Sequence, residues 1–332
     1  MKVFSDTIIY VHCPGCVASG GPEALHVLAH ELRRRGHDAR MMYYDLASCK
    51  DFSVAPSRIV HDRFKRFGVP YVIQADDNPH NIAIFPETAA ARLSRFPSSQ
   101  RAFWWLSVDF YTRPWEWKGI WHSLWWCRER FRRFLYPISA ADITHLCQSY
   151  YALDYVRSRG FARRYLLMDY LGDEFLSASA VENAVREDLV VYNPLKGSAF
   201  TQKLIAASPD IRFYPLTAMT PGQVRDTCMR SRVYIDFGEH PGKDRFPREA
   251  ALLGNVIITN RKGSAGFQED VPIPEEYKFA GTSADIPQIR ELILKSFAEY
   301  QERAKQFDGY RSFIREDKAR FLAQVDEIFI PA

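Results

Sequence analysis

The sequence lacks a secretory signal, a membrane-length apolar run and any internal repeat. Residues 1–10 contain Asp6 and no long apolar core ending in a small-residue cleavage site, so we expect a cytoplasmic protein. Charged side chains interrupt the aromatic stretch at residues 104–126 well short of about twenty apolar residues, which excludes a membrane span there. The absence of a repeat of solenoid length excludes a stacked-repeat architecture.

Cysteine is sparse and irregularly placed. The six cysteines lie at positions 13, 16, 49, 127, 147 and 228, without the spacing of a disulfide framework, so we expect reduced thiols. Cys13 and Cys16 form a CxxC pair, which is compatible with a redox pair or half of a zinc site. No second pair follows at zinc-finger spacing. We therefore expect structural thiols, with a redox function as an alternative.

A strong excess of charge of one sign is also missing. The 44 Lys and Arg residues against 40 Asp and Glu residues give a net charge of +4, and the two signs are interspersed. This pattern argues against a nucleic-acid partner and is compatible with an enzyme that handles anionic nucleotides. With 332 residues, of which 47% are hydrophobic, the chain is long enough for two soluble domains with separate cores.

The first half of the sequence predicts a β-α-β unit. Residues 7–12 read as an apolar strand, and a glycine-rich turn leads to a helix that starts at residue 22 or 23 and ends at Gly36. A second strand follows at residues 38–44, as is typical of a doubly wound domain. Further strands are expected at residues 59–60, 71–74, 103–108, 143–148 and 165–168.

Carboxylates follow two of the predicted strands. Asp76 and Asp77 come after the strand at residues 71–74, where a metal site, a general base and an Asx-rich turn before Pro79 are all open interpretations. Asp109, next to Ser107, occupies a comparable place after the strand at residues 103–108.

Tryptophan is concentrated in one segment. All seven lie between residues 104 and 126, and a basic stretch follows at residues 128–133. Aromatic side chains beside basic ones are compatible with an anionic membrane surface or with stacking on sugar rings. Packing of the tryptophans into a core, with the arginines in solvent, is the third open interpretation.

The second half repeats the strand-loop-helix order. Small and acidic residues at positions 172–187 are typical of an interdomain linker. A strand at residues 188–192, a helix at 200–207, a strand at 211–215 and a helix at 221–231 are expected, with Thr220 as the cap of the last helix. Residues 296–307 and 310–328 read as helices.

The most informative segment lies between a strand at residues 233–237 and a helix that is expected to begin at Pro247 and end at Gly254. Its loop contains Gly238, His240, Gly242, Lys243 and Arg245. Glycines allow the backbone to approach a ligand, the three side chains suit phosphate oxygens, and a helix N-terminus adds the positive end of its dipole. The loop therefore predicts a diphosphate site, and Glu249 is suited to ribose hydroxyls.

Two segments resemble GT-B glycosyltransferases. In the C-terminal half of that family a Glu after a glycine-containing loop holds the donor ribose and is followed by Ala, a small residue and Gly. Arg248-Glu249-Ala250-Ala251 and Gly254-Asn255-Val256-Ile257-Ile258 match this pattern, and Ser19-Gly20-Gly21-Pro22 is similar to the opening of the acceptor domain. The resemblance implies an α/β fold of two Rossmann-like doubly wound domains facing across a cleft.

The loops and the resemblance together imply a set of site residues. Donor phosphate contacts are expected from Lys196, His240, Gly242, Lys243, Arg245 and Gly21. Glu249 is expected to bind the ribose, and Leu216 and Thr217 the base. His240 would help to neutralise the leaving diphosphate, and Asp109 would be the base for an acceptor hydroxyl if the enzyme inverts. We expect no bound metal, because cationic side chains and amides would perform that task.

The expected domains are residues 1–172 for the acceptor, residues 173–310 for the nucleotide sugar, and a C-terminal helix at residues 311–332 that packs back on the first domain. The expected function is transfer of a sugar from a nucleotide-activated donor to a glycan or lipid-linked acceptor in polysaccharide biosynthesis. A membrane-linked acceptor would place the protein at the inner face of the membrane.

Three points leave the donor, the mechanism and the class of protein open to alternatives. Many retaining members of the family have a second Glu eight positions before the ribose Glu, where this sequence has Pro241, with Glu239 and His240 as neighbouring candidates. The run Glu239-His240-Pro241 also resembles the His-Pro motif of transferases that use cytidine-monophosphate sugars. A noncatalytic nucleotide-binding or scaffold protein of a polysaccharide assembly complex is the alternative from another class.

Overall fold

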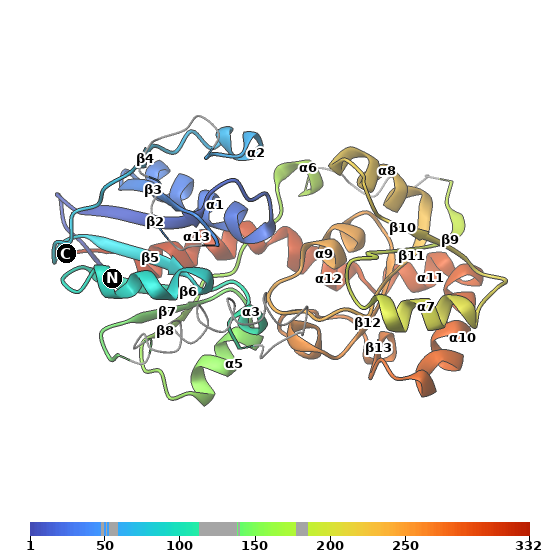
Figure 1. Cartoon of the computed structure of the whole chain (residues 1–332). Helices are drawn as coiled ribbons and strands as arrows, with labels where there is room; N and C mark the ends of the chain where they lie inside the picture. The colour runs from blue at the N-terminus through green and yellow to red at the C-terminus, as the bar shows by residue number, and fades with distance from the viewer. Residues whose placement is uncertain (48–49, 51, 53–58, 113–137, 139, 177–184) are drawn as a thin grey trace. The chain divides into compact units, whose positions relative to one another are not determined.

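The computed structural model describes all residues except 48, 49, 51, 53–58, 113–137, 139 and 177–184 (Figure 1). The chain divides into two compact units. The first contains Met1–Met168 and Phe321–Ala332, and the second contains Asp169–Arg320. The chain therefore passes from one unit to the other at two places.

The first unit is built on a parallel sheet with seven described strands in the order β4-β3-β2-β5-β6-β7-β8. These strands are β2 (Ile8–Pro14), β3 (Asp38–Tyr44), β4 (Tyr71–Val72), β5 (Ile82–Pro86), β6 (Gln100–Trp105), β7 (Thr144–Cys147) and β8 (Arg164–Leu166). In its register Ile9 lies beside Ala39 on one side and Ile82 on the other.

Helical segments connect these strands. They are α1 (Gly20–Arg34), α2 (Asp62–Lys65), η1 (Glu87–Arg95), α3 (Val108–Thr112) and α5 (Tyr150–Ser158). Gly36 follows α1 with φ of 85°, a conformation that ends the helix as predicted. A short pair of β1 (Lys2–Val3) and β14 (Ile330–Pro331) joins the two ends of the chain within this unit.

The sequence predictions for the first unit differ from the structure at residues 59–60 and in the centre of the sheet. Residues 59–60 form a bend and not a strand. The strand β5 was not predicted, although it lies in the centre of the sheet between β2 and β6. Its side chains are all buried, so its sequence is a continuous apolar run without the alternation that marks a half-exposed strand.

The described tryptophans belong to the core of the first unit. Trp104 and Trp105 lie in β6 and are both fully buried. The indole Nε1 of Trp104 donates to the carbonyl of Leu167, and that of Trp105 donates to Nδ1 of His145. Packing in the core is therefore confirmed for these two, and the other tryptophans and the basic stretch lie outside the described residues.

Cys13 of the CxxC pair does not have the environment of a reactive thiol. Cys13 is fully buried in β2, and burial raises the pKa of its thiol well above the ordinary value. The nearest ring nitrogen, Nδ1 of His26, lies 4.0 Å from the sulfur and 2.6 Å from the carbonyl of Pro22, so its proton is directed to that carbonyl. A reactive thiolate needs a lowered pKa, which this environment does not provide.

The second unit is built on a parallel sheet with five described strands in the order β10-β9-β11-β12-β13. These strands are β9 (Glu187–Tyr192), β10 (Arg212–Pro215), β11 (Ser231–Asp236), β12 (Val256–Asn260) and β13 (Lys278–Phe279). The apolar side chains of β11 and β12, among them Val233, Ile257 and Ile258, are buried in its core.

Helices alternate with these strands and continue to the C-terminus. They are α6 (Asp173–Leu176), α7 (Ser198–Ala206), α8 (Pro221–Arg230), α9 (Arg245–Leu252), α10 (Ile286–Ala298), α11 (Tyr300–Lys305), α12 (Asp308–Arg315) and α13 (Asp317–Ile328), with a turn of 3-10 helix, η2 (Gly263–Gly266), after β12. None of the helices within the described residues is long and apolar enough to cross a membrane.

Local sequence signals explain two helix boundaries. Thr220 caps α8 as predicted: its hydroxyl accepts from the amide of Gln223, whose side chain accepts from the amide of Thr220. Gly254, with φ of 93°, follows the end of α9 as predicted. The start of α9 differs from the prediction, because the helix begins at Arg245. Pro247 lies inside the first turn, where its missing N–H has no helical partner to lose.

Gly197 is required by both its conformation and its surroundings. It precedes α7 with φ of 58°, and a Cβ at this position would lie 2.3 Å from the carbonyl oxygen of Phe237. We expect Gly197→Ala to lower the free energy of unfolding by more than the roughly 1 to 2 kcal/mol of left-handed strain alone. The control is Gly160→Ala, which has φ of 75° and no atom within 4 Å of the added Cβ. Equal losses in urea unfolding would contradict the proposed close contact.

Candidate functional site

The predicted donor residues lie at the carboxyl edge of the sheet in the second unit. Lys196 follows β9, Leu216 and Thr217 follow β10, and the loop of residues 237–244 connects β11 to α9. Because all pairs in this sheet are parallel, these segments leave it at the same edge. That edge is where open α/β sheets bind their ligands.

Donors at the end of β12 and after it fix the backbone of the loop at residues 237–244. The side-chain amide of Asn260 donates to the carbonyl of Gly238 over 2.6 Å. Ser264 donates twice, from its amide to the carbonyl of His240 over 2.8 Å and from its hydroxyl to the carbonyl of Gly242 over 2.6 Å. These bonds satisfy three backbone carbonyls of the loop and so hold Gly238 and Gly242 in one backbone conformation.

Lys196 reaches this loop from the neighbouring strand. Its ammonium lies 2.7 Å from Oδ1 of Asp244, the residue immediately before α9. A Cβ on Gly238 would lie 2.5 Å from the Cβ of Lys196, so the glycine permits the approach of the lysine. The structure therefore brings Lys196 together with the loop that contains His240, Gly242 and Lys243, and with the start of α9 at Arg245.

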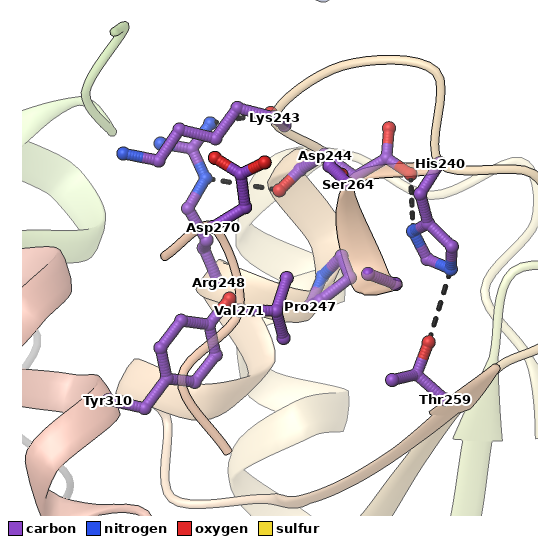
Figure 2. A pocket seen from close by; sticks show the side chains of 11 residues that line it. His240, Lys243, Asp244, Pro247, Arg248, Thr259, Ser264, Asp270, Val271 and Tyr310 are labelled. Carbon is purple, nitrogen blue, oxygen red and sulfur yellow. Dashed lines mark hydrogen bonds and ion pairs between the residues drawn. The ribbon is translucent and has the colours of Figure 1, made fainter. Parts of the chain in front are cut away.

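His240 is buried and uses both ring nitrogens (Figure 2). Nδ1 lies 2.8 Å from the carboxylate of Asp244, and Nε2 lies 3.1 Å from the hydroxyl of Thr259. The hydrogen of that hydroxyl is directed to the carbonyl of Asp236, so Nε2 must act as the donor to Thr259. The carboxylate beside Nδ1 and the donation from Nε2 together favour the imidazolium form of the ring.

Electrostatics supports the charged form of His240. Burial lowers the pKa of the imidazole, but the hydrogen bond to Asp244 and the charge of Asp236 outweigh burial and raise it above the ordinary 6.5. For Asp244, burial raises the pKa, but the hydrogen bond from His240 and the charge of Lys196 outweigh it, so the pKa is lowered. The two groups stabilise each other's charges.

Arg245 and Glu249 form a pair on the first turn of α9. Nε of Arg245 lies 3.2 Å from Oε1 of Glu249, at the i,i+4 spacing that places both on one face of the helix. The cation expected to bind phosphate and the carboxylate expected to bind ribose therefore lie side by side.

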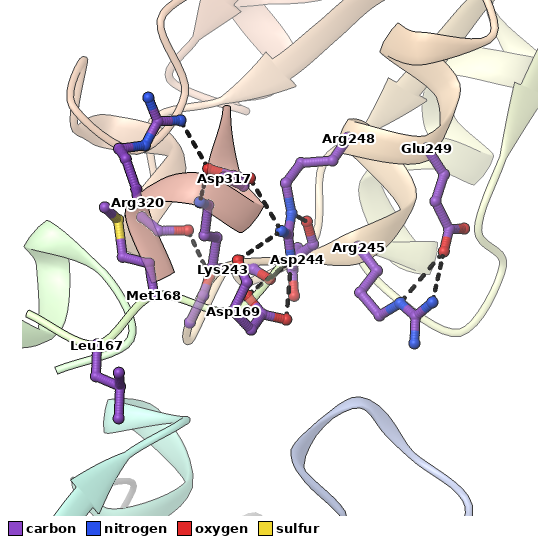
Figure 3. A network of polar contacts seen from close by, with 12 residues as sticks. Leu167, Met168, Asp169, Lys243, Asp244, Arg245, Arg248, Glu249, Asp317 and Arg320 are labelled. Atoms are coloured by element: carbon purple, nitrogen blue, oxygen red, sulfur yellow. Dashed lines mark hydrogen bonds and ion pairs between the residues drawn. The ribbon is translucent and has the colours of Figure 1, made fainter. Parts of the chain in front are cut away.

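Lys243 and Arg248 point to the interior of the second unit (Figure 3). The ammonium of Lys243 lies 2.6 Å from Oδ1 of Asp317, and both groups are buried. Burial lowers the pKa of Lys243, and the charge of Asp317 offsets only part of this effect. Arg248 makes ion pairs with Asp169 and Asp317.

The remaining predicted residues lie at other places. The amide of Leu216 donates to the carbonyl of Tyr192 over 2.8 Å, which holds Leu216 and Thr217 beside the end of β9. In the first unit, Gly21 lies in the first turn of α1 and Asp109 lies in α3. A hydrogen bond of 2.6 Å from the hydroxyl of Tyr151 orients the Asp109 carboxylate. Both residues follow the carboxyl ends of strands of their own sheet.

Of the carboxylates at this site, Glu249 was predicted, whereas Asp236, Asp244, Asp169 and Asp317 were not. Lys196 and His240 share Asp244, Arg245 has Glu249, and Lys243 and Arg248 share Asp317. A local signal exists for Asp236 and Asp244, which flank His240 at equal spacing. No local signal exists for Asp169 and Asp317, because they are distant in the sequence from the loop.

Two features of the site concern its cavity and its possible metal ligands. The pocket lined by His240, Lys243, Asp244, Pro247, Arg248 and Tyr310 has a volume of about 10 Å³, room for about one water molecule. Among the described residues, Asp236, His240 and Asp244 have ligand atoms within 4.8 Å of one another, as a metal site requires. Their atoms already bond Tyr234, Thr259 and Lys196, and an ammonium beside Asp244 opposes a second cation.

The architecture is that of the GT-B fold, with two α/β units that each contain a parallel sheet. The chain is similar to HepE of Anabaena in complex with UDP, with a TM-score of 0.64, 11% identity and coverage of 99% of this chain and 98% of that one. A sucrose-phosphate synthase from Thermosynechococcus elongatus gives a TM-score of 0.63 at 12% identity, covering 99% and 98%. WaaG, a glycosyltransferase involved in lipopolysaccharide biosynthesis, gives 0.55 at 9% identity, covering 97% and 98%.

These similarities confirm the predicted fold class, two Rossmann-like domains of the GT-B type. No model of a protein family matches the chain, and no curated protein sequence matches it. At this level of identity the likeness establishes the fold, and the function has to be argued from the residues of the site.

The charged state of His240 predicts a pH dependence of stability. Because the pKa of His240 in the folded chain is raised above 6.5, its contribution is fully present below that value and is lost as the pH rises through the folded pKa. We expect the urea midpoint to fall as the pH rises above 6.5, and to fall less in His240→Gln. An equal fall in both proteins would contradict the imidazolium assignment. The paired contribution of Asp244 is lost only in acid, below 3.8, and does not affect this window.

Proposed function

We propose that the protein is a glycosyltransferase that transfers a sugar from a nucleotide-activated donor to a glycan or lipid-linked acceptor. The observation that carries the proposal is the convergence of Lys196, Arg245 and Glu249 on the glycine loop at the N-terminus of α9. The GT-B fold supports it, as does the binding of UDP and of UDP-glucose by the similar protein HepE.

The donor diphosphate in this proposal replaces carboxylates as the partner of the cations. Lys196 leaves Asp244, Arg245 turns from Glu249 to a phosphate oxygen, and the Gly242 backbone and the helix dipole add to the field. Glu249 is then available to the ribose hydroxyls. Leu216 and Thr217 contact the base.

Two residues have a supporting part in the phosphate site. His240, fully engaged with Asp244 and Thr259, supplies a fixed positive charge beneath the loop. Lys243 braces the loop through Asp317. These charges stabilise the leaving diphosphate when its bond to the anomeric carbon breaks and the acceptor oxygen bonds to that carbon. If the enzyme inverts the anomeric configuration, Asp109 takes the proton of the acceptor hydroxyl. The scheme needs no metal.

A nucleoside-diphosphate sugar is favoured over a cytidine-monophosphate sugar. The latter donor class would require His240 to meet the single phosphate. In this chain both ring nitrogens of His240 are directed to protein groups and the ring is buried, which leaves Lys196 and Arg245 as the direct phosphate ligands.

Calorimetric titration with UDP, GDP, dTDP and CMP tests the donor site. We expect one diphosphate to bind more tightly than CMP, with the same affinity in EDTA. Arg245→Ala and Lys196→Ala should weaken it roughly ten- to hundredfold, because a charged hydrogen bond contributes about 1.5 to 3 kcal/mol. Lys243→Ala is a less suitable variant, since it would leave Asp317 without one of its buried cations.

The matched control is Arg290→Ala on α10, which removes an exposed arginine paired with Asp210 over 2.6 Å. It should bind the nucleotide as the wild type does. Wild-type affinity in both Arg245→Ala and Lys196→Ala would refute the donor site. Tight binding without turnover of any nucleotide sugar would instead favour a noncatalytic nucleotide-binding protein.

A further inference from the structure

Arg248 is the centre of a buried hydrogen-bond network in the second unit (Figure 3). Its guanidinium donates to the carbonyls of Lys243 and Asp244, over 2.9 and 3.0 Å. It thereby holds the last two residues of the loop at residues 237–244, which we call the donor loop. It also donates to both carboxylate oxygens of Asp169, over 3.0 and 3.1 Å, and to the carboxylate of Asp317 over 3.4 Å.

Asp317 is the ion-pair partner of Lys243 in the loop. The ammonium of Lys243 lies 2.6 Å from its Oδ1, and a guanidinium nitrogen of Arg320 lies 2.8 Å from the same oxygen. Asp317 is fully buried, and Arg248 is only 1% exposed. A desolvated charge is stable only while its partners stay in place, so neither the loop nor its carboxylate partners can move independently at low cost.

The two carboxylates occupy special places in the chain. Asp169 is the first residue after the chain leaves the first unit at Met168. Asp317 begins α13, the helix that returns to the first unit between Arg320 and Phe321. Arg248 and Lys243 therefore tie the donor loop to both segments through which the chain passes between the units.

We infer that Arg248 is a positioning residue that couples occupancy of the donor loop to the order of both connecting segments. The inference rests on the proposed donor site. An anion that draws Lys196 and Arg245 from their carboxylates shifts the loop backbone at residues 243 and 244. Arg248 follows these carbonyls, and its bonds to Asp169 and Asp317 transmit the change. Because coupling is reciprocal, the state of the connecting segments also sets donor affinity.

Amide hydrogen exchange of the full chain with and without UDP tests this coupling, with inorganic pyrophosphate as a second probe that lacks base and ribose. We expect UDP to slow exchange severalfold in three peptides, covering the loop at residues 238–249 and the connecting segments at residues 165–172 and 314–322. Protection of the loop with no change in either connecting segment would overturn the inference alone. No protection of the loop by either probe would overturn the proposed function as well.

Two isosteric variants make the test selective. Asp169→Asn should abolish the UDP-induced slowing at residues 165–172 and keep it at residues 314–322, and Asp317→Asn should do the reverse. Asp210→Asn, which breaks the exposed ion pair with Arg290, is the matched control and should leave both responses unchanged. A purely structural network would instead give faster exchange in both segments, equally with and without UDP, and this result would overturn the inference.

If the buried variants fail to fold, the wild-type measurement still decides the question. Arg248→Lys provides a second check, because it retains the charge without the fork that holds Asp169 in a bidentate pair. We expect it to weaken UDP binding severalfold and to reduce the response of both connecting segments together. Full responses in Arg248→Lys would contradict the positioning role of the guanidinium.

Discussion

The burial of the Arg248 guanidinium is the constraint on which the second unit depends. A charge removed from water is stable only when carboxylates and carbonyls surround it, and Arg248 finds them in Asp169, Asp317 and the backbone of Lys243 and Asp244. The charge of Asp169, together with that of Asp317, raises the pKa of Arg248 against the opposing effect of burial. One side chain therefore bonds to the residues just before α9 and to one residue of each connecting segment.

The cations of the donor loop and its neighbours are paired with carboxylates, so the loop does not present an excess of positive charge. Each of its cations has a carboxylate partner, and His240 is held as an imidazolium between Asp244 and Thr259. In the proposed function, phosphate oxygens replace the carboxylates at Lys196 and Arg245, so an anion would bind by exchange of partners. Before a ligand arrives, the carboxylate partners lower the free-energy cost of keeping the cations buried. Because the partners must be exchanged, binding would be sensitive to the exact position of the loop.

How far the sequence could predict this structure depends on the range of the interactions. The cap at Thr220 and the helix end at Gly254 were predicted because a few neighbouring residues determine them. The strand β5 was missed because full burial removes the alternation that identifies a strand. The loop at residues 237–244 was singled out through its glycines and cations, and its function as a donor site stays a prediction. Its dependence on Asp169 and Asp317 could not be predicted, since only the tertiary fold brings them together.

A crystal structure of the protein with bound UDP tests the central claim most directly. We predict phosphate oxygens within hydrogen-bond distance of Lys196 and Arg245 at the N-terminus of α9, with the ribose hydroxyls on Glu249 and Arg248 still bonded to the loop carbonyls. UDP bound elsewhere, with Lys196 still paired to Asp244 and Arg245 to Glu249, would contradict the account.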